Sequence, residues 1–297
     1  MTKLADLLKP EVLHTVNGLE LAARVIVEGF MSGSNQSQTI GAGQEFSQYR
    51  NYEPGDDLRQ LDWKMYARSE RYYIKQADVE TNITVRFMID ASHSMAYEEG
   101  GFSKLLYAKV MTAALAYLAR KQSDAFGLFT VNEKHITAIQ PRFEQQQFMR
   151  FLNTLVNVSS EGTWRKGNGL EQLFSPYGKE LIVFMTDLYD DQRDLQDFIG
   201  KLKTTRNEVI VFHLLGQHET SMDFDGSFTF EDLENKVRIK VDSRSQQQAY
   251  QARVQQWLKD SRAWMLEKQI NYYRVMLNEP VEQVLRDFLT IRKRMVR

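Results

Sequence analysis

Asp90, Ser92 and Ser94 lie within five consecutive residues and directly follow a short apolar run, residues 85–89. A second apolar run, later in the chain, ends at Asp187. Short apolar runs of this kind are typical of buried strands. If the two strands are parallel neighbours, their carboxyl ends meet at one edge of a sheet, where ligands bind in α/β folds. Carboxylate and hydroxyl oxygens suit a hard cation, so the pattern predicts a divalent cation site at this edge.

A third hydroxyl is expected from the polar loop between the two strands. Thr163 is the predicted ligand, with Thr186, Ser159 and Ser160 as alternatives. The expected ion is Mg²⁺, with Mn²⁺ and Ca²⁺ as alternatives. Because only two carboxylates are available, such an ion keeps positive charge and an open position for a carboxylate of another protein. The competing interpretation is structural: the aspartates cap helices and the serines satisfy loop amides.

A regular alternation of strand and helix patterns begins near residue 84. It predicts an α/β fold, with a mostly parallel sheet flanked by helices on both faces. The expected strands are 84–90, 125–131, 135–140, 180–187, 208–215 and 270–277, and the expected helices are 103–122, 143–158, 191–203, 248–269 and 280–295. Alternating residues near 221–243 predict a hairpin insertion.

Two domains are expected from this organisation. Residues 81–297 carry the alternating pattern, whereas residues 1–80 combine a helical pattern over 9–30 with an extension rich in arginine and aromatic residues. We expect this N-terminal part to pack on the core of the larger domain.

Composition excludes several classes of protein. The 297 residues carry a formal net charge of −1 and include no cysteine. Disulfide frameworks and thiol catalysis are therefore excluded, and nothing in the charge favours nucleic acid as a partner. The sequence has neither a signal-peptide pattern nor an apolar run long enough to cross a bilayer, which predicts a cytoplasmic protein without membrane insertion.

The stretch RNYEPGDDLRQLDWKMYAR, residues 50–68, resembles the hallmark of a bacterial family known as domain of unknown function 58. Residues 90–94 match the D-x-S-x-S motif of von Willebrand factor A domains. The resemblance implies a von Willebrand factor A-like (Rossmann-like) fold with a metal-ion-dependent adhesion site, in which Thr163 and Asp187 follow in the right order. Members are commonly encoded beside MoxR-type AAA+ ATPases, so the resemblance implies such an ATPase, and other von Willebrand factor A proteins, as partners. Many members carry N-terminal membrane segments, which are not seen in this sequence.

The segment 46–76 contains the residues that we predict to bind a partner. Arginine and aromatic side chains are enriched at binding hot spots. An internal network of ion pairs between arginines and aspartates is the simpler interpretation, and the two are compatible. The predicted partner-binding residues are Arg50, Tyr52, Asp56, Asp57, Arg59, Asp62, Trp63 and Arg68.

Together these patterns predict a non-enzymatic protein that binds other proteins through a divalent cation, as an adaptor in an AAA+ ATPase chaperone system. The first alternative is a metal-free interaction scaffold that uses residues 46–76. The second is a metal-dependent hydrolase. It is the weakest hypothesis, because His93 is the single candidate for a general base close to the motif in sequence.

Overall fold

The computed structural model describes most of the chain and divides it into two compact units. The larger unit comprises residues 1–33 and 83–297, and the smaller comprises residues 34–82. The described residues are 9–34, 49–53, 56, 61–75, 83–165, 173, 180–189, 194–223, 226–234 and 236–295.

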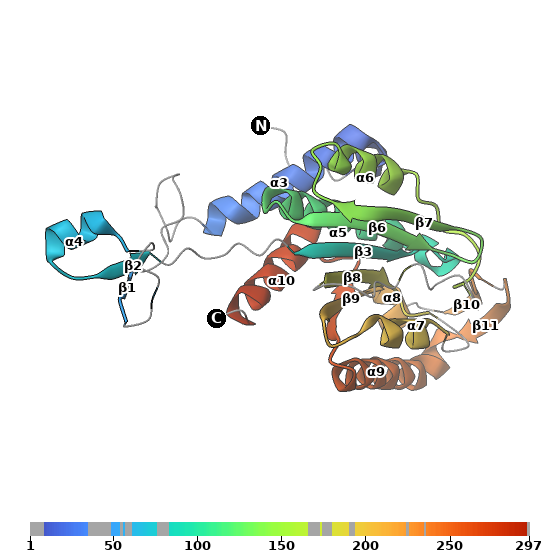
Figure 1. Cartoon of the computed structure of the whole chain (residues 1–297). Helices are drawn as coiled ribbons and strands as arrows, with labels where there is room; N and C mark the ends of the chain where they lie inside the picture. Colours follow the sequence, from blue (N-terminus) through green and yellow to red (C-terminus); the bar gives the residue numbers. More distant parts are fainter. Residues whose placement is uncertain are drawn as a thin grey trace. The chain divides into compact units, whose positions relative to one another are not determined.

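A six-stranded sheet forms the centre of the larger unit (Figure 1). Its order is β12-β9-β8-β3-β6-β7, and every neighbouring pair is parallel except β6 and β7. The strands are β3 Thr84–Asp90, β6 Ala125–Val131, β7 Ile136–Arg142, β8 Glu180–Thr186, β9 Asn207–Leu215 and β12 Asn271–Met276. The predicted α/β class is confirmed, and β3 and β8 are adjacent, as the cation-site prediction required.

Helices cover both faces of this sheet (Figure 1). On one side lie α2 Pro10–Leu13, α3 Val16–Ser34, α5 Lys104–Lys121, α6 Gln147–Val156 and α10 Val281–Met295, and on the other lie α7 Asp194–Leu202 and α9 Ser243–Glu267. Side chains alternate between the two cores along each strand. We call the core on the α5 side of the sheet the first core and the core on the α7 side the second. In β3, for example, Phe87 and Ile89 enter the first core, while Met88 enters the second.

The predicted hairpin insertion is present. Strands β10 Ser227–Glu231 and β11 Arg238–Asp242 pair antiparallel, with Ser227 opposite Asp242. A short helix, α8 Gln217–Ser221, precedes them. A second, smaller hairpin, β4 Glu98–Glu99 and β5 Phe102–Ser103, follows a 3₁₀ turn over His93–Ala96.

Among the residues of the smaller unit that the structure describes, there is one antiparallel pair of strands and one helix. Strand β1 Tyr49–Asn51 pairs with β2 Tyr73–Lys75, and helix α4 Trp63–Ser69 lies between them in sequence. Asp62 begins this helix, because its carboxylate accepts hydrogen bonds from the N–H groups of Lys64 and Met65 at 2.9 and 3.1 Å.

The N-terminal helix differs from expectation in two ways. It is split into α2 and α3, because the Thr15 hydroxyl accepts the Gly18 N–H at 3.1 Å and starts a new helix. It also groups with the larger unit, since Leu19, Ala23 and Val27 of α3 are buried in the first core. The larger unit thus begins with this helix and resumes at residue 83, close to the predicted boundary at residue 80. No helix of the described residues is long and apolar enough to span a bilayer.

Candidate metal centre and adjoining pocket

Asp90 is the last residue of β3 and is fully buried. Its Oδ1 atom accepts the N–H of Ser92 at 3.0 Å, and its Oδ2 atom accepts the hydroxyl of Thr186 at 2.8 Å. The second contact crosses from β3 to the end of β8. The two strand ends are therefore joined through one carboxylate.

Ser92, Ser94 and Asp187 complete a continuous set of oxygens with Asp90. The two serine hydroxyls lie 3.0 Å apart, and the Ser94 hydroxyl donates to Asp187 Oδ1 at 3.2 Å. All four side chains are buried. The structure thus brings together four of the five predicted ligands.

Thr163 lies in a loop that contacts the motif through its backbone. The carbonyl oxygen of Gly162 accepts the N–H of His93 at 2.7 Å, and that of Ala91 accepts the N–H of Glu161 at 2.9 Å. The Thr163 hydroxyl itself donates to the carbonyl oxygen of Trp164 at 3.2 Å. Of the alternatives, Thr186 is the residue whose hydroxyl bonds an aspartate of the site.

Lys104 is a member of the site that the sequence patterns missed. Its side chain is buried, and its ammonium lies 2.9 Å from Asp187 Oδ2 and 2.7 Å from Glu219 Oε1. One signal was available. Lys104 is the first residue of α5, after the N-cap Ser103, and a cation at a helix N-terminus opposes the helix dipole. A buried lysine in that position therefore needs a carboxylate from another part of the fold to stabilise its charge.

The electrostatics of the site favour a cation. Burial, followed by the nearby charge of Asp187, raises the pKa of Asp90 to about 7, against the hydrogen bonds from Ser92 and Thr186. Burial also raises the pKa of Glu234, in the turn of the β10–β11 hairpin, to about 7, although its interaction with Ser94 opposes the shift. For Lys104, burial lowers the pKa, but the two carboxylates outweigh burial and hold it above its usual value.

A buried histidine fixes the backbone of Asp187. The ring of His213, on β9, has Nε2 at 2.9 Å from the carbonyl oxygen of Asp187 and Nδ1 at 2.7 Å from the hydroxyl of Tyr272 on β12. Because a carbonyl can only accept, Nε2 carries the proton and Nδ1 accepts from Tyr272. Burial lowers the pKa of His213 to about 3, which keeps the ring neutral. His213 therefore positions the site and is not a ligand.

The donor set fits a hard divalent cation. Its members are carboxylate and hydroxyl oxygens that already contact one another in a chain. Oε1 of Glu234 is a buried atom without a hydrogen-bond partner among the described residues, and its carboxylate is close enough to interact with Ser94. The described residues include no cluster of three or more Asp, Glu or His side chains that could hold a metal, so hydroxyls and water must supply the remaining ligands.

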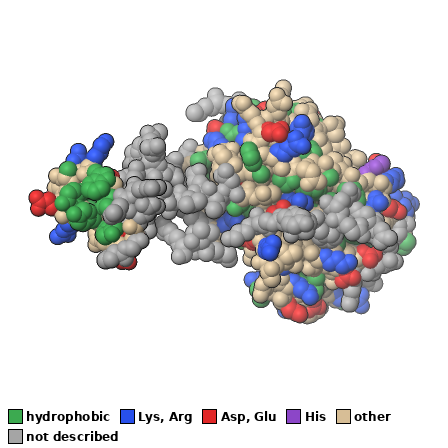
Figure 2. Space-filling view, viewed as in Figure 1, with side chains coloured by type: hydrophobic (Ala, Val, Ile, Leu, Met, Phe, Trp, Pro, Cys, Tyr) green, Lys and Arg blue, Asp and Glu red, His purple; other side chains and the backbone are tan. Residues whose placement is uncertain are grey.

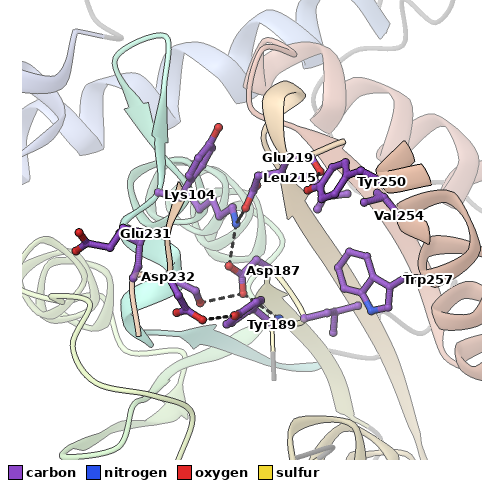
Figure 3. A pocket seen from close by; sticks show the side chains of 14 residues that line it. Lys104, Asp187, Tyr189, Leu215, Glu219, Glu231, Asp232, Tyr250, Val254 and Trp257 are labelled. Carbon is purple, nitrogen blue, oxygen red and sulfur yellow. Dashed lines mark hydrogen bonds and ion pairs between the residues drawn. The ribbon is translucent and has the colours of Figure 1, made fainter. Parts of the chain in front are cut away.

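A pocket of about 470 Å³ adjoins the site and shares Ser94 and Asp187 with it (Figure 3). Its other lining residues come from helices α5, α8 and α9, from the strand ends and from the hairpin. They are Tyr97, Lys104, Leu188, Tyr189, Leu215, Glu219, Glu231, Asp232, Leu233, Tyr250, Val254 and Trp257.

The predicted partner-binding residues lie in the smaller unit, insofar as they are described. Trp63 and Arg68 are exposed on α4, and the rings of Tyr66 and Tyr72 stack with centroids 4.6 Å apart. Figure 2 shows hydrophobic side chains gathered on one face of this unit.

The two described aspartates of this unit, Asp56 and Asp62, serve local structure. Asp62 caps α4, and Asp56 Oδ2 accepts the N–H of Glu53 at 2.9 Å. Tyr52 is half-buried and Arg50 lies in β1. Asp57 and Arg59 lie outside the described residues, as does the side chain of Arg50. The proposed network of arginine–aspartate ion pairs therefore remains a prediction.

Comparison with known proteins adds a family and distant relatives. A family model described as "Protein of unknown function DUF58" matches residues 48–263. The uncharacterized protein Mb1516 of Mycobacterium bovis is 21% identical over 243 residues, covering 78% of this chain and 74% of that protein, and Rv1480 of Mycobacterium tuberculosis matches equally. The family match includes both residues 50–68 and residues 90–94.

The solved structures found by structural comparison have lower sequence identity than these relatives. The conserved hypothetical protein BatB of Bacteroides thetaiotaomicron is 12% identical, with a TM-score of 0.44 over 71% of this chain and 98% of that chain. The VWA domain of SpRpn10 is 11% identical, with a TM-score of 0.38 over 69% of this chain and 94% of that domain.

Proposed function

This chain belongs to the DUF58 family of proteins of unknown function, and we propose that it binds partner proteins through a divalent cation held by Asp90, Ser92, Ser94 and Asp187. The contact between Ser94 and Asp187 carries the proposal, because it joins the loop after β3 to the end of β8 in one oxygen-lined site. When bound, the ion supplies positive charge and an open position for a partner's carboxylate. Thr163 is a further candidate ligand in the adjoining loop.

The protein's own residues prepare this site. Thr186 and the Ser92 N–H hold the Asp90 carboxylate, and His213 holds the backbone of Asp187. The Asp90 carboxylate and the Asp187 backbone are thereby held in place before an ion binds. We propose a MoxR-type AAA+ ATPase as the partner and a non-enzymatic adaptor role, on the support of the family resemblance.

Thermal unfolding of the full chain tests the cation site. A ligand that binds the folded state at 100 times its Kd adds about 2.7 kcal/mol of stability. We therefore expect millimolar Mg²⁺ or Mn²⁺ to raise the Tm by roughly 5–10 °C. Asp90→Ala should abolish this shift, whereas the control Asp260→Asn, at an exposed position on α9, should retain it. Binding to a MoxR-type ATPase from the same host should be lost in EDTA and in Asp90→Ala.

A metal-free scaffold is the second candidate. The ammonium of Lys104 already compensates Asp187, and Trp63 is 61% exposed on the smaller unit. Partner binding that persists in EDTA and in Asp90→Ala, without any metal-dependent Tm shift, would favour this candidate. Phosphatase turnover that Asp90→Ala removes would favour the hydrolase instead.

A further inference from the structure

The pocket beside the cation site has a wall made of aromatic rings. Tyr250 and Trp257 line it from α9, and Tyr97 and Tyr189 line it from loops at the carboxyl edge of the sheet. Figure 3 shows the α9 residues on one side of the pocket and Glu231 and Asp232 of the hairpin on the other. Aromatic faces attract cations within about 6 Å of the ring centroid.

The charged residues of the pocket also favour a positively charged ligand. Four acidic residues and one lysine are among its lining residues: Asp187, Glu219, Glu231, Asp232 and Lys104. The carboxylate of Glu231 points away from the pocket (Figure 3). The ammonium is already committed to Asp187 and Glu219. The other two acidic residues lie on the hairpin. Asp232 accepts the Tyr189 hydroxyl at 2.6 Å and the Glu234 N–H at 2.8 Å, and so keeps its full negative charge at the pocket. The ion pairs of Glu231 with Lys236 and Arg238 are solvent-exposed. Exposed pairs of this kind contribute little and exchange readily.

Lys104 shows that this environment stabilises a primary ammonium. Its Nζ lies 5.1 Å from the centroid of the Tyr97 ring and pairs with two carboxylates at the same time. Apolar side chains line the pocket as well, among them Leu215, Leu233 and Val254. A long basic side chain matches this combination, because its aliphatic stem packs on apolar surface while its charged end meets rings and carboxylates.

We propose that this pocket receives a lysine or arginine side chain of the partner protein. The inference deepens the proposed function, because the pocket shares Ser94 and Asp187 with the cation site. A partner would then present an acidic side chain to the ion and a basic side chain to the neighbouring pocket. An acidic side chain would meet like charge in the pocket, and a purely apolar one would remove water from its carboxylates without adding an opposite charge.

The test uses the full chain in EDTA and a probe that isolates one side chain. Nα-acetyl-lysine N-methylamide is titrated by ligand-observed NMR beside the norleucine and glutamate analogues. We expect the lysine compound to bind about tenfold more tightly than norleucine, as one cation–π contact with charge compensation implies, and the glutamate compound to bind least. Equal binding of the lysine and norleucine compounds would overturn the proposal.

Variants connect the binding to the pocket. The double change Glu231→Gln with Asp232→Asn should weaken lysine binding about fivefold or more, while the control pair Asp260→Asn with Glu267→Gln, exposed on α9, should leave it unchanged. If the first pair loses its fold by circular dichroism, Val254→Arg occupies the pocket from α9 and should remove binding. Lysine binding that survives in a folded pocket variant would refute the assignment.

Asp90→Ala separates this inference from the proposed function. It should abolish the Mg²⁺ shift but retain lysine binding, because Asp90 is absent from the pocket lining. If Mg²⁺ does not raise the Tm, the titration with the lysine compound still tests the pocket. If the lysine compound does not bind, the Tm measurement still tests the cation site.

Discussion

The ammonium of Lys104 lies 2.9 Å from Oδ2 of Asp187, and both side chains are buried. The same ammonium also pairs with Glu219. One of the two aspartates of the site, Asp187, is therefore already paired with a positive charge from the protein itself. A divalent cation has to share Asp187 with Lys104, so this lysine is expected to set the affinity of the site.

Lys104→Met tests this competition. It leaves the buried Asp187 and the half-buried Glu219 without their cation, so the free energy of unfolding in EDTA should fall by about 3–5 kcal/mol. The affinity for Mg²⁺ should rise, because the ion no longer competes with the ammonium. Urea unfolding and calorimetric titration measure the two effects. Lys121→Met is the matched control: it lies on the same helix, and its ion pair with Glu28 is exposed and 3.7 Å long, so it should change stability by less than about 1 kcal/mol. Unchanged Mg²⁺ affinity in a folded Lys104→Met protein would contradict the competition.

Thr186→Val tests the support of Asp90. The hydroxyl of Thr186 donates to Asp90 Oδ2 and accepts the N–H of Leu188 at 3.0 Å. Its loss leaves Asp90 Oδ2 and the N–H of Leu188 without this partner, so the free energy of unfolding should fall by about 1–3 kcal/mol. The rise in Tm caused by Mg²⁺ should become smaller. Thr290→Val is the control, because Thr290 is exposed on its helix and bonds the carbonyl of Arg286. If both variants change stability equally, the contact to Asp90 has no special weight.

Lys109 gives a prediction for pH. Its ammonium is buried, donates to the carbonyl oxygen of Val156 at 2.9 Å, and has its pKa lowered by burial to about 8. Between about pH 8 and 10.5 the unfolded chain therefore binds more protons than the folded one, so this group makes stability rise with pH in that window.

Denaturant unfolding measured from pH 7 to pH 10 checks this sign. The stability of the unmodified protein relative to Lys109→Met should increase by roughly 1–3 kcal/mol over the range. Lys121→Met, at an exposed position on the same helix, controls for general effects of alkali. A constant difference between the Lys109 variant and the unmodified protein would show that the ammonium is not titrating there.

Trp63→Ala tests docking by the smaller unit. The indole is 61% exposed and lies edge-on to Tyr66, with ring centroids 6.2 Å apart. Its removal should change stability by less than about 1 kcal/mol, because little packing is lost. It should weaken binding to the ATPase about tenfold, as expected for an aromatic hot spot, and leave the Mg²⁺ shift intact. Phe143→Ala, a 75% exposed aromatic in the larger unit, is the control. If both variants bind the ATPase equally well, the exposed face of α4 around Trp63 is not part of the interface.

Much of the fold was accessible from local patterns. Buried strands show as short apolar runs, and the alternation with helices leaves few arrangements other than a covered, mostly parallel sheet. The four predicted oxygen ligands were accessible for the same reason, since each lies at the end of β3 or within four residues beyond the end of β3 or β8. The N-terminal helix was harder, because a single threonine cap at Thr15 divides it and its partner, α5, lies far along the chain.

The sequence by itself determined which residues end β3 and β8, and hence that Asp90, Ser92, Ser94 and Asp187 lie at one edge. Only the tertiary structure decided what surrounds them. Lys104, Glu219 and His213 reach the site from separate elements, across 26 to 115 positions of chain. The aromatic pocket likewise exists only once α9 and the hairpin lie beside the sheet. Charge compensation depends on distance in space, which sequence periodicity does not encode, and these contacts determine the charge balance around the proposed cation site.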